Sequence, residues 1–164
     1  MSSGPRPSAI EFATTESLYD FVIEFVLNDA AKRASLREIA VLSLSYSNFD
    51  QIKAAGKYRK KLFVIDSRED LMKVQYAGKR IIYSSPEYVS GFQFQTVLVC
   101  DVNMFDSETG ERTTWQDRRF ASLAYLAASR ARQELYFLGD KSFGGLADII
   151  TAGIASNIIE RKVP

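Results

Sequence analysis

Residues 120–138 read FASLAYLAASRARQELYFL and join a helix pattern directly to a strand pattern. The apolar run at 135–138 predicts a buried strand. A helix that leads into a buried strand is one unit of a sheet with helices packed on its faces. The helix face has apolar side chains at spacings of three and four, and we expect it to comprise Phe120, Leu123, Ala124, Ala127 and Ala131.

The same alternation of helix and strand patterns continues toward the N-terminus. An apolar face within residues 18–26 predicts a helix capped by Thr14 or Thr15. Ser67 resembles the start of another helix, because the acid Asp70 stands at its third helical position. Residues 146–159 predict a closing helix that is broken near Gly153. Further apolar runs predict strands at 9–12, 39–44, 62–65, 80–83 and 97–101.

Strands of this apolar character that alternate with helices are typical of a parallel sheet covered on both faces. The predicted fold class is therefore α/β, a three-layer α/β/α domain with a mostly parallel sheet. We expect residues 1–7 to form a flexible lead and residues 8–160 to form a single domain. In such sheets ligands bind beyond the carboxyl ends of the strands.

The composition excludes several kinds of chemistry. Histidine is absent and Cys100 is the only cysteine, so histidine-based triads, histidine-containing metal sites and internal disulfides are excluded. Cys100 ends an apolar run, and we expect it to pack as a small hydrophobic residue. The 21 basic and 20 acidic residues balance, so a polybasic tail is not the main device for binding nucleic acid.

No apolar run approaches the ~20 residues of a membrane span, and the N-terminus lacks the layout of a signal peptide. We therefore expect a cytoplasmic protein with no membrane partner. The phosphate-loop pattern G-x-x-x-x-G-K-[ST] and the pattern G-x-G-x-x-G are both absent. The chain alone is not expected to cradle a triphosphate by either device.

Two segments carry a resemblance to a known family. Residues 83–99, YSSPEYVSGFQFQTVLV, resemble motif V of the UvrD/Rep-like superfamily 1 DNA helicases, in which a hydroxyl residue and a short loop precede Lys-Gly-Leu-Glu-Phe and an apolar strand. Residues 123–132, LAYLAASRAR, are similar to motif VI, Leu-x-Tyr-Val-Ala-Leu-Thr-Arg-Ala followed by a strand. The order of the two segments also matches that family, and the resemblance covers most of residues 9–145.

The resemblance implies a RecA-like domain that is the C-terminal half of a helicase, carrying motifs V and VI. It implies a site for ATP with Mg²⁺ shared with a separate first RecA-like domain that holds the phosphate loop. Arg130 would be the catalytic arginine finger, because a guanidinium stabilises the negative charge that phosphoryl transfer spreads over the γ-phosphate. The alternative is that Arg130 and Arg132 only favour a helix C-terminus electrostatically. In either case the apolar face is expected to hold the helix, so that replacing Arg130 leaves folding intact.

Motifs V and VI together imply that Gly91, Gln93 and Arg130 contact the nucleotide, and motif V implies that Ser85 contacts DNA. Gly91 stands where the chain is expected to turn tightly before a strand. Gln93 replaces the family's Glu, Ser90 replaces its Lys, and Glu87 stands near the DNA contact, where it would repel phosphate. Phe92 and Phe94 are expected to belong to the core rather than to stack on bases.

The stretch from Lys53 to Lys61 is basic, contains no acid and includes one aromatic residue, Tyr58. Basic residues with an interleaved aromatic suit a site for single-stranded DNA, and we expect Lys57, Arg59 and Lys60 to contribute to it. The alternative is a solvated face. The acids between residues 101 and 117, including Asp106 and Glu108, are expected to lie in a solvated loop rather than to bind a metal.

The leading hypothesis is thus the C-terminal half of an ATP-dependent UvrD-like DNA helicase, whose partners are a phosphate-loop domain and single-stranded DNA. The chain alone is expected to show no ATP turnover. The alternative is a degenerate helicase-like module that binds protein or DNA without turnover, which the residues at 87, 90 and 93 favour. An unrelated α/β signalling domain would require both motif matches to be accidental.

Overall fold

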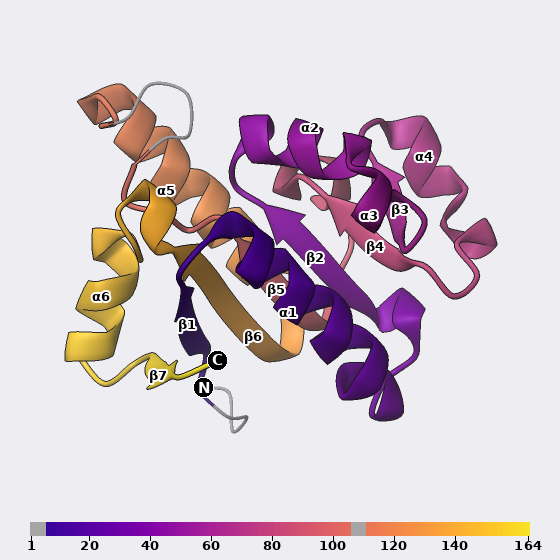
Figure 1. Ribbon diagram of the computed structural model, residues 1–164, viewed down its shortest axis with the longest axis horizontal. Coiled ribbons are helices and arrows are strands. Elements are labelled where there is room, and N and C mark those ends of the chain that lie inside the picture. The colour runs from indigo at the N-terminus through magenta and orange to yellow at the C-terminus, as the bar shows by residue number, and fades with distance from the viewer. Residues whose placement is uncertain (1–5, 106–110) are drawn as a thin grey trace.

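The computed structural model describes residues 6–105 and 111–164, which form a single sheet with helices on both faces (Figure 1). All paired strands run parallel, in the order β3-β4-β2-β5-β6-β1-β7. The parallel sheet predicted from the apolar runs is confirmed. The strands are β1 (Ser8–Phe12), β2 (Ile39–Ser43), β3 (Leu62–Ile65), β4 (Ile81–Ser84), β5 (Phe94–Cys100), β6 (Ala131–Asp140) and β7 (Glu160–Lys162).

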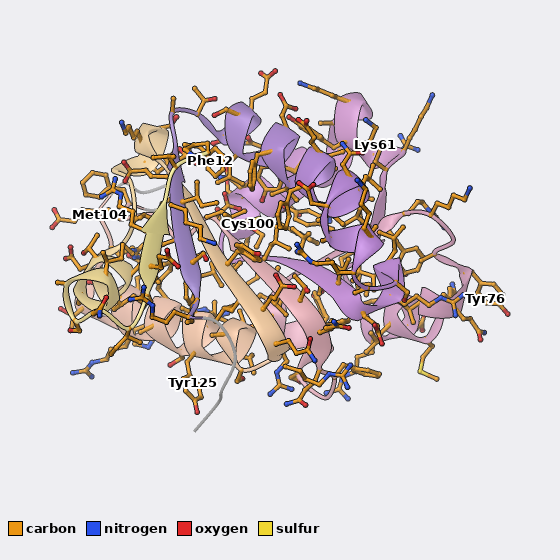
Figure 2. All side chains as sticks on the ribbon, turned by 90° about the horizontal axis from the view of Figure 1, so that it is seen from below. Phe12, Lys61, Tyr76, Cys100, Met104 and Tyr125 are labelled. Carbon is orange, nitrogen blue, oxygen red and sulfur yellow. The ribbon has the colours of Figure 1, made fainter. Side chains whose placement is uncertain are left out.

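The helices form two layers because each buries an apolar side against one face of the sheet. One face is covered by α1 (Thr15–Asn28), α2 (Tyr46–Ala54) and α3 (Gly56–Arg59), whose buried residues share one core cluster with the strands. The other face is covered by α4 (Arg68–Met72), α5 (Thr114–Ala128) and α6 (Asp148–Ala155). Cys100 is fully buried beneath α1, and burial raises the pKa of its thiol, as expected for a packing residue (Figure 2).

Local sequence signals set the helix starts. Thr14 caps α1 by accepting a hydrogen bond from the Ser17 amide, and the Ser17 hydroxyl accepts from the Thr14 amide in return. Ser67 caps α4 by accepting from the Asp70 amide, as its sequence predicts. Five short 3₁₀ turns also connect elements of the described chain: Ala30–Lys32, Leu36–Glu38, Val74–Tyr76, Pro86–Val89 and Lys141–Phe143.

Two predicted helix boundaries are wrong. The predicted helix face reaches Ala131, but α5 ends at Ala128 and Ala131 begins β6, where it pairs with Phe94. The closing helix is not broken at Gly153, which lies inside α6; the chain turns at Asn157, whose φ is 62°.

The ends of the described chain lie side by side at one edge of the sheet (Figure 1). The Glu160 amide donates a 2.8 Å hydrogen bond to the Pro7 carbonyl, and the Arg6 guanidinium donates to the Asn157 carbonyl at 3.3 Å. Of the predicted flexible lead, residues 6 and 7 are therefore held in place, while residues 1–5 lie outside the described part. β7 continues to Lys162, beyond the predicted domain end at residue 160. None of the helices described here is long and apolar enough to cross a bilayer.

Candidate functional site

The two segments that resemble helicase motifs meet at the amino ends of adjacent strands. The motif V segment runs into β5 and the motif VI segment runs into β6, and these strands pair in parallel. Their first contact is a 2.7 Å hydrogen bond from the Phe94 amide to the Arg130 carbonyl. The fold thus joins residues separated by about 40 positions in the sequence into one surface.

Arg130 occupies the short turn between α5 and β6, and its side chain folds back onto the motif V segment. Its Nη1 donates to the carbonyl oxygens of Ser90 and Phe92, the latter at 3.2 Å. Its Nη2 donates to the Ser129 hydroxyl at 3.2 Å, and that hydroxyl donates to the Leu126 carbonyl at 2.9 Å. Among the described residues, its buried Nε finds no acceptor. The guanidinium therefore links the two motif segments at the sheet edge.

Gly91 and Gln93 are both exposed beside this guanidinium. A Cβ at Gly91 would meet no atom within 4 Å, and the residue does not adopt a positive φ. The turn before β5 therefore does not require glycine at this position, because the backbone here accepts a side chain. Phe94 is buried in the core as predicted, whereas Phe92 is 48% exposed, which corrects its assignment to the core.

The predicted DNA-contact residues lie elsewhere. Ser85 follows β4 at the carboxyl edge of the sheet and is only 2% exposed, so its hydroxyl does not face solvent. Lys57 is the first residue after Gly56 in α3 and pairs with two carboxylates of α1, Asp20 at 2.9 Å and Glu16 at 3.0 Å.

These carboxylates raise the pKa of Lys57, Asp20 foremost, and the hydrogen bond from Lys57 lowers the pKa of Asp20. The basic stretch contains no acid in its own sequence, but the fold pairs its Lys57 with the carboxylates of α1. Arg59 and Lys60 are exposed, and no ion pair joins either of them to another described residue.

A polar network lies at the opposite edge, beyond the carboxyl ends of β2 and β5. Asp101 follows β5 with a φ of 63° and is 2% exposed. Its carboxylate accepts hydrogen bonds from the Ser43 hydroxyl at 2.5 Å, the Tyr19 hydroxyl at 2.6 Å and the side-chain nitrogen of Asn48 at 3.0 Å. Burial raises the pKa of Asp101, although these donors oppose the shift. The Tyr19 hydroxyl also lies 2.8 Å from the Tyr83 hydroxyl, which extends the network from α1 to β4.

No motif in the sequence pointed to this network. Its members come from α1, α2 and three neighbouring strands, so only the tertiary fold brings them together. The one local signal is a carboxylate directly after a buried strand, at the edge where ligands of α/β sheets bind. The solvated loop predicted for the acids of residues 101–117 is wrong at both ends, because Asp101 is buried and Asp117 lies in the first turn of α5. Asp106 and Glu108 lie outside the described residues. Within the described ranges, no group of three metal-ligating side chains is found.

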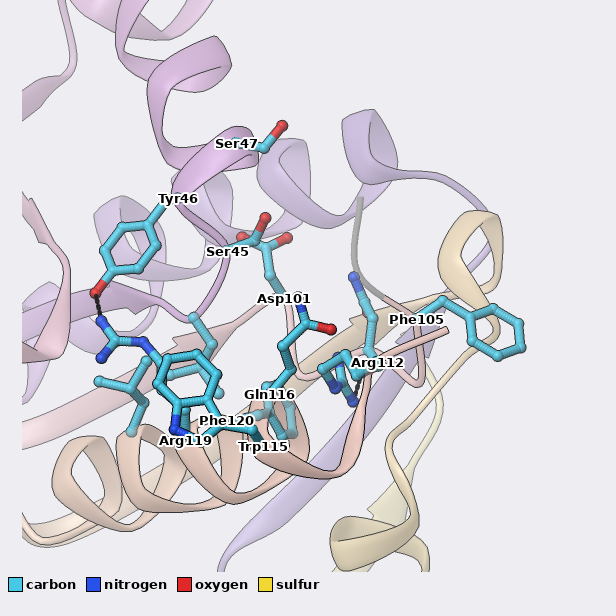
Figure 3. A pocket seen from close by; sticks show the side chains of 13 residues that line it. Ser45, Tyr46, Ser47, Asp101, Phe105, Arg112, Trp115, Gln116, Arg119 and Phe120 are labelled. Atoms are coloured by element: carbon cyan, nitrogen blue, oxygen red, sulfur yellow. Dashed lines mark hydrogen bonds between the residues drawn. The ribbon is translucent and has the colours of Figure 1, made fainter. Parts of the chain in front are cut away.

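A pocket of about 220 Å³ opens beside Asp101 (Figure 3). The segments that follow β2 and β5 form one side of the pocket, and the first turns of α5 form the other. Tyr46 and Arg119 stand together, since Arg119 donates a 2.7 Å hydrogen bond to the Tyr46 hydroxyl. This pocket and the Arg130 surface lie at opposite ends of the parallel strands.

The parallel sheet covered on both faces defines a three-layer α/β/α fold of the RecA-like class. The chain is similar to the crystal structure of the C-terminal domain of a possible DNA helicase from Lactobacillus plantarum WCFS1, with a TM-score of 0.69 and 21% sequence identity. The match covers 96% of this chain and 86% of that chain, and at this identity it establishes the fold. No protein-family model and no curated protein matches the chain.

Proposed function

We propose that this chain is the C-terminal RecA-like half of a UvrD-like DNA helicase, and that it completes an ATP site whose phosphate loop lies on another domain. Arg130 is the arginine finger, and Gly91 and Gln93 line the nucleotide beside it. Mg²⁺ arrives with ATP and is held by the phosphate-loop domain. Single-stranded DNA is the second partner, and the compartment is the cytoplasm.

The observation that carries this proposal is the meeting of the two motif segments around Arg130. The two segments lie far apart in the sequence, yet both reach the same edge of the sheet, where the Phe94 amide donates a hydrogen bond to the Arg130 carbonyl. Gly91 and Gln93 are exposed on the same edge, where a second domain has access. The fold that this chain shares with a possible helicase's C-terminal domain agrees with the assignment.

The contacts of Arg130 define how a phosphate would engage it. Its Nη1 donates to the neutral carbonyl oxygens of Ser90 and Phe92. A phosphate is negatively charged and its oxygens match the fork of a guanidinium in a bidentate pair, so it attracts the group more strongly than neutral carbonyls do. A γ-phosphate brought by the phosphate-loop domain would therefore draw the guanidinium away from Ser90 and Phe92. The guanidinium would then stabilise charge on the γ-phosphate oxygens during transfer.

The test is steady-state ATP turnover, with DNA present, by this chain together with its phosphate-loop domain. We expect Arg130→Ala to weaken ATP binding modestly and to lower turnover by roughly 10³- to 10⁵-fold, as for other arginine fingers. Arg130→Lys should restore little, because an ammonium does not present a planar fork. Arg132→Ala is the matched control, since Arg132 is exposed one residue into β6. Equal turnover in the Arg130→Ala and Arg132→Ala proteins would exclude the finger.

The alternative function is a helicase-like module that binds without turnover. Gln93 and Ser90 depart from the family's motif, and the engaged guanidinium of Arg130 gives that residue a structural task without any nucleotide. In this case Arg130→Ala would lower the stability of the chain. The unmodified chain, assembled with its phosphate-loop domain, would show no ATP turnover.

A further inference from the structure

The pocket beside Asp101 lies at a topological switch point of the sheet. β2 continues into α2 on one face, whereas the neighbouring β5 leads to α5 on the other face. The two connections therefore diverge and leave a crevice between the carboxyl ends of β2 and β5. Ligands of open α/β sheets bind in crevices of this kind. The Arg130 surface is at the other end of the strands, so this crevice is a separate site.

Aromatic and other apolar side chains form part of the pocket wall. Tyr46 and Trp115 stand at its rim with 46% and 69% of their surface exposed, and Phe120 and Leu123 lie deeper. Exposed aromatic rings around a concavity indicate a binding surface rather than a core. At about 220 Å³ the pocket is smaller than the roughly 300–1,000 Å³ of drug-sized ligand sites, so it fits one ring system.

The charges of the pocket are already paired, which decides the chemistry of the ligand. Arg112 forms a 3.1 Å ion pair with Asp117 and donates to the Asn103 carbonyl at 2.7 Å. Arg119 forms a 3.0 Å ion pair with Glu87. Each guanidinium thus has a carboxylate partner, and the pocket offers little net positive charge to a phosphate.

Two neutral polar side chains, Gln116 and Tyr46, also line the pocket. The Gln116 side-chain oxygen accepts from the Thr113 amide, and its amide nitrogen donates to no described residue. The Tyr46 hydroxyl accepts from Arg119, which also orients the ring at the rim (Figure 3). A ligand with a purely hydrocarbon ring would leave the Gln116 amide nitrogen without a protein or ligand partner, at a cost.

We propose that this pocket binds one unstacked nucleobase, a flat ring with neutral hydrogen-bonding edges, which stacks on Trp115 and Tyr46. The base can belong to a free nucleoside or to a single strand, since both present the same ring. Stacking on aromatic side chains contributes about 1–3 kcal/mol per base and tolerates any base. The site holds whether or not Arg130 serves as an arginine finger.

Trp115 is the only tryptophan of the chain, so its fluorescence reports this pocket directly. The experiment titrates the whole chain with adenosine and follows quenching, after correction with free tryptophan amide. We expect saturable quenching whose midpoint changes less than twofold between low and high salt, because no phosphate contact is used. Quenching by inorganic phosphate or ribose 5-phosphate, but not by adenosine, would overturn the proposal in favour of an anion site. Equal quenching by N-acetyl-phenylalanine amide would overturn it in favour of a protein side chain.

Two variants test the geometry. Tyr46→Ala should weaken adenosine binding about tenfold, whereas Tyr46→Phe, which keeps the ring, should lose less than threefold. Tyr76→Ala is the matched control, because Tyr76 is 70% exposed and lies outside the pocket. An effect of Tyr76→Ala as large as that of Tyr46→Ala would show non-specific stacking and refute the site. A dT oligonucleotide and its abasic analogue then identify the source of the base. If the oligonucleotide binds more tightly than adenosine, and its binding depends on Tyr46 and is lost in the abasic analogue, the base belongs to a strand. If adenosine binds as tightly as the oligonucleotide, the base belongs to a free nucleoside.

Discussion

The guanidinium of Arg130 donates a 3.2 Å hydrogen bond to the carbonyl oxygen of Phe92, which joins the start of β6 to the segment before β5. The same group also binds the Ser90 carbonyl and the Ser129 hydroxyl. The residue with the strongest motif resemblance is therefore also part of the structure of the sheet edge. A role in stability and a role toward phosphate can both be measured.

Replacement of Arg130 by Ala should lower the free energy of unfolding by about 1–2 kcal/mol, because charge-assisted hydrogen bonds typically contribute about 1.5–3 kcal/mol and this site is partly exposed. This differs from the expectation drawn from the helix face alone, which ignores the carbonyl contacts. Urea unfolding of the isolated chain provides the measurement, with Arg132→Ala expected to change stability by less than about 0.5 kcal/mol. An Arg130→Ala protein as stable as Arg132→Ala would show that the carbonyl contacts contribute nothing.

The buried Asp101 should give the protein a distinctive pH dependence. Burial raises its pKa in the folded state above the ordinary 3.8, so the folded chain binds the proton more tightly than the unfolded chain. This contribution to stability is therefore fully present below pH 3.8 and is lost as the pH rises through the higher folded pKa. Urea unfolding from pH 3.5 upward should show that loss in the unmodified chain.

Asp101→Asn is the matched variant, because it keeps the shape of the side chain and removes the titrating group. Its stability should lack the decrease that Asp101 causes, so the difference between the two proteins should change across this pH range. A constant difference would indicate that Asp101 titrates at its ordinary pKa in the folded protein.

The buried strands could be predicted because each contains a run of apolar residues in the sequence, and all six predicted strands are present. β7 was not, since Glu160–Lys162 are exposed and carry no apolar signal. Spacing alone continued the α5 face to Ala131, but the backbone pairing of Phe94 with Arg130 starts a strand there. The resemblance assigned residues of both motif segments to one nucleotide site, but the direct pairing of the two segments was not predicted from the sequence. The carbonyl partners of Arg130 and the side-chain partners of Lys57 and Asp101 could not be predicted, because each of these lies at least 37 residues away along the chain.

Pairing in α3 changes which basic residues should matter for DNA. Lys57 is neutralised by Asp20 and Glu16, whereas Arg59 and Lys60 are exposed. The double variant Arg59→Ala/Lys60→Ala should reduce the slope of log affinity against log salt by about 1–2 for single-stranded DNA, whereas Lys57→Ala should reduce it by less than about 0.5. Fluorescence anisotropy of a labelled oligonucleotide at several salt concentrations measures both. Equal slopes in all three proteins would make the stretch a solvated face.

Gly91 offers a way to separate a functional role from a structural one. Its backbone accepts a Cβ without any contact below 4 Å. Gly91→Ala should therefore leave the free energy of unfolding unchanged or raise it by about 0.4–1 kcal/mol, because alanine lowers the conformational entropy of the unfolded chain. Gly145→Ala is the contrasting variant: Gly145 has a φ of 78°, and a Cβ there would lie 2.4 Å from a Glu11 carboxylate oxygen. We expect Gly145→Ala to cost more than 1 kcal/mol in urea unfolding.

If Gly91 lines the nucleotide, Gly91→Ala should lower ATP turnover in the assembled protein while the isolated chain unfolds at the same urea concentration as before. The added methyl group would then meet the nucleotide rather than any atom of this chain, because the structure leaves that space open. Unchanged turnover in a fully folded Gly91→Ala protein would remove Gly91 from the nucleotide site and leave Arg130 and Gln93 as its candidates.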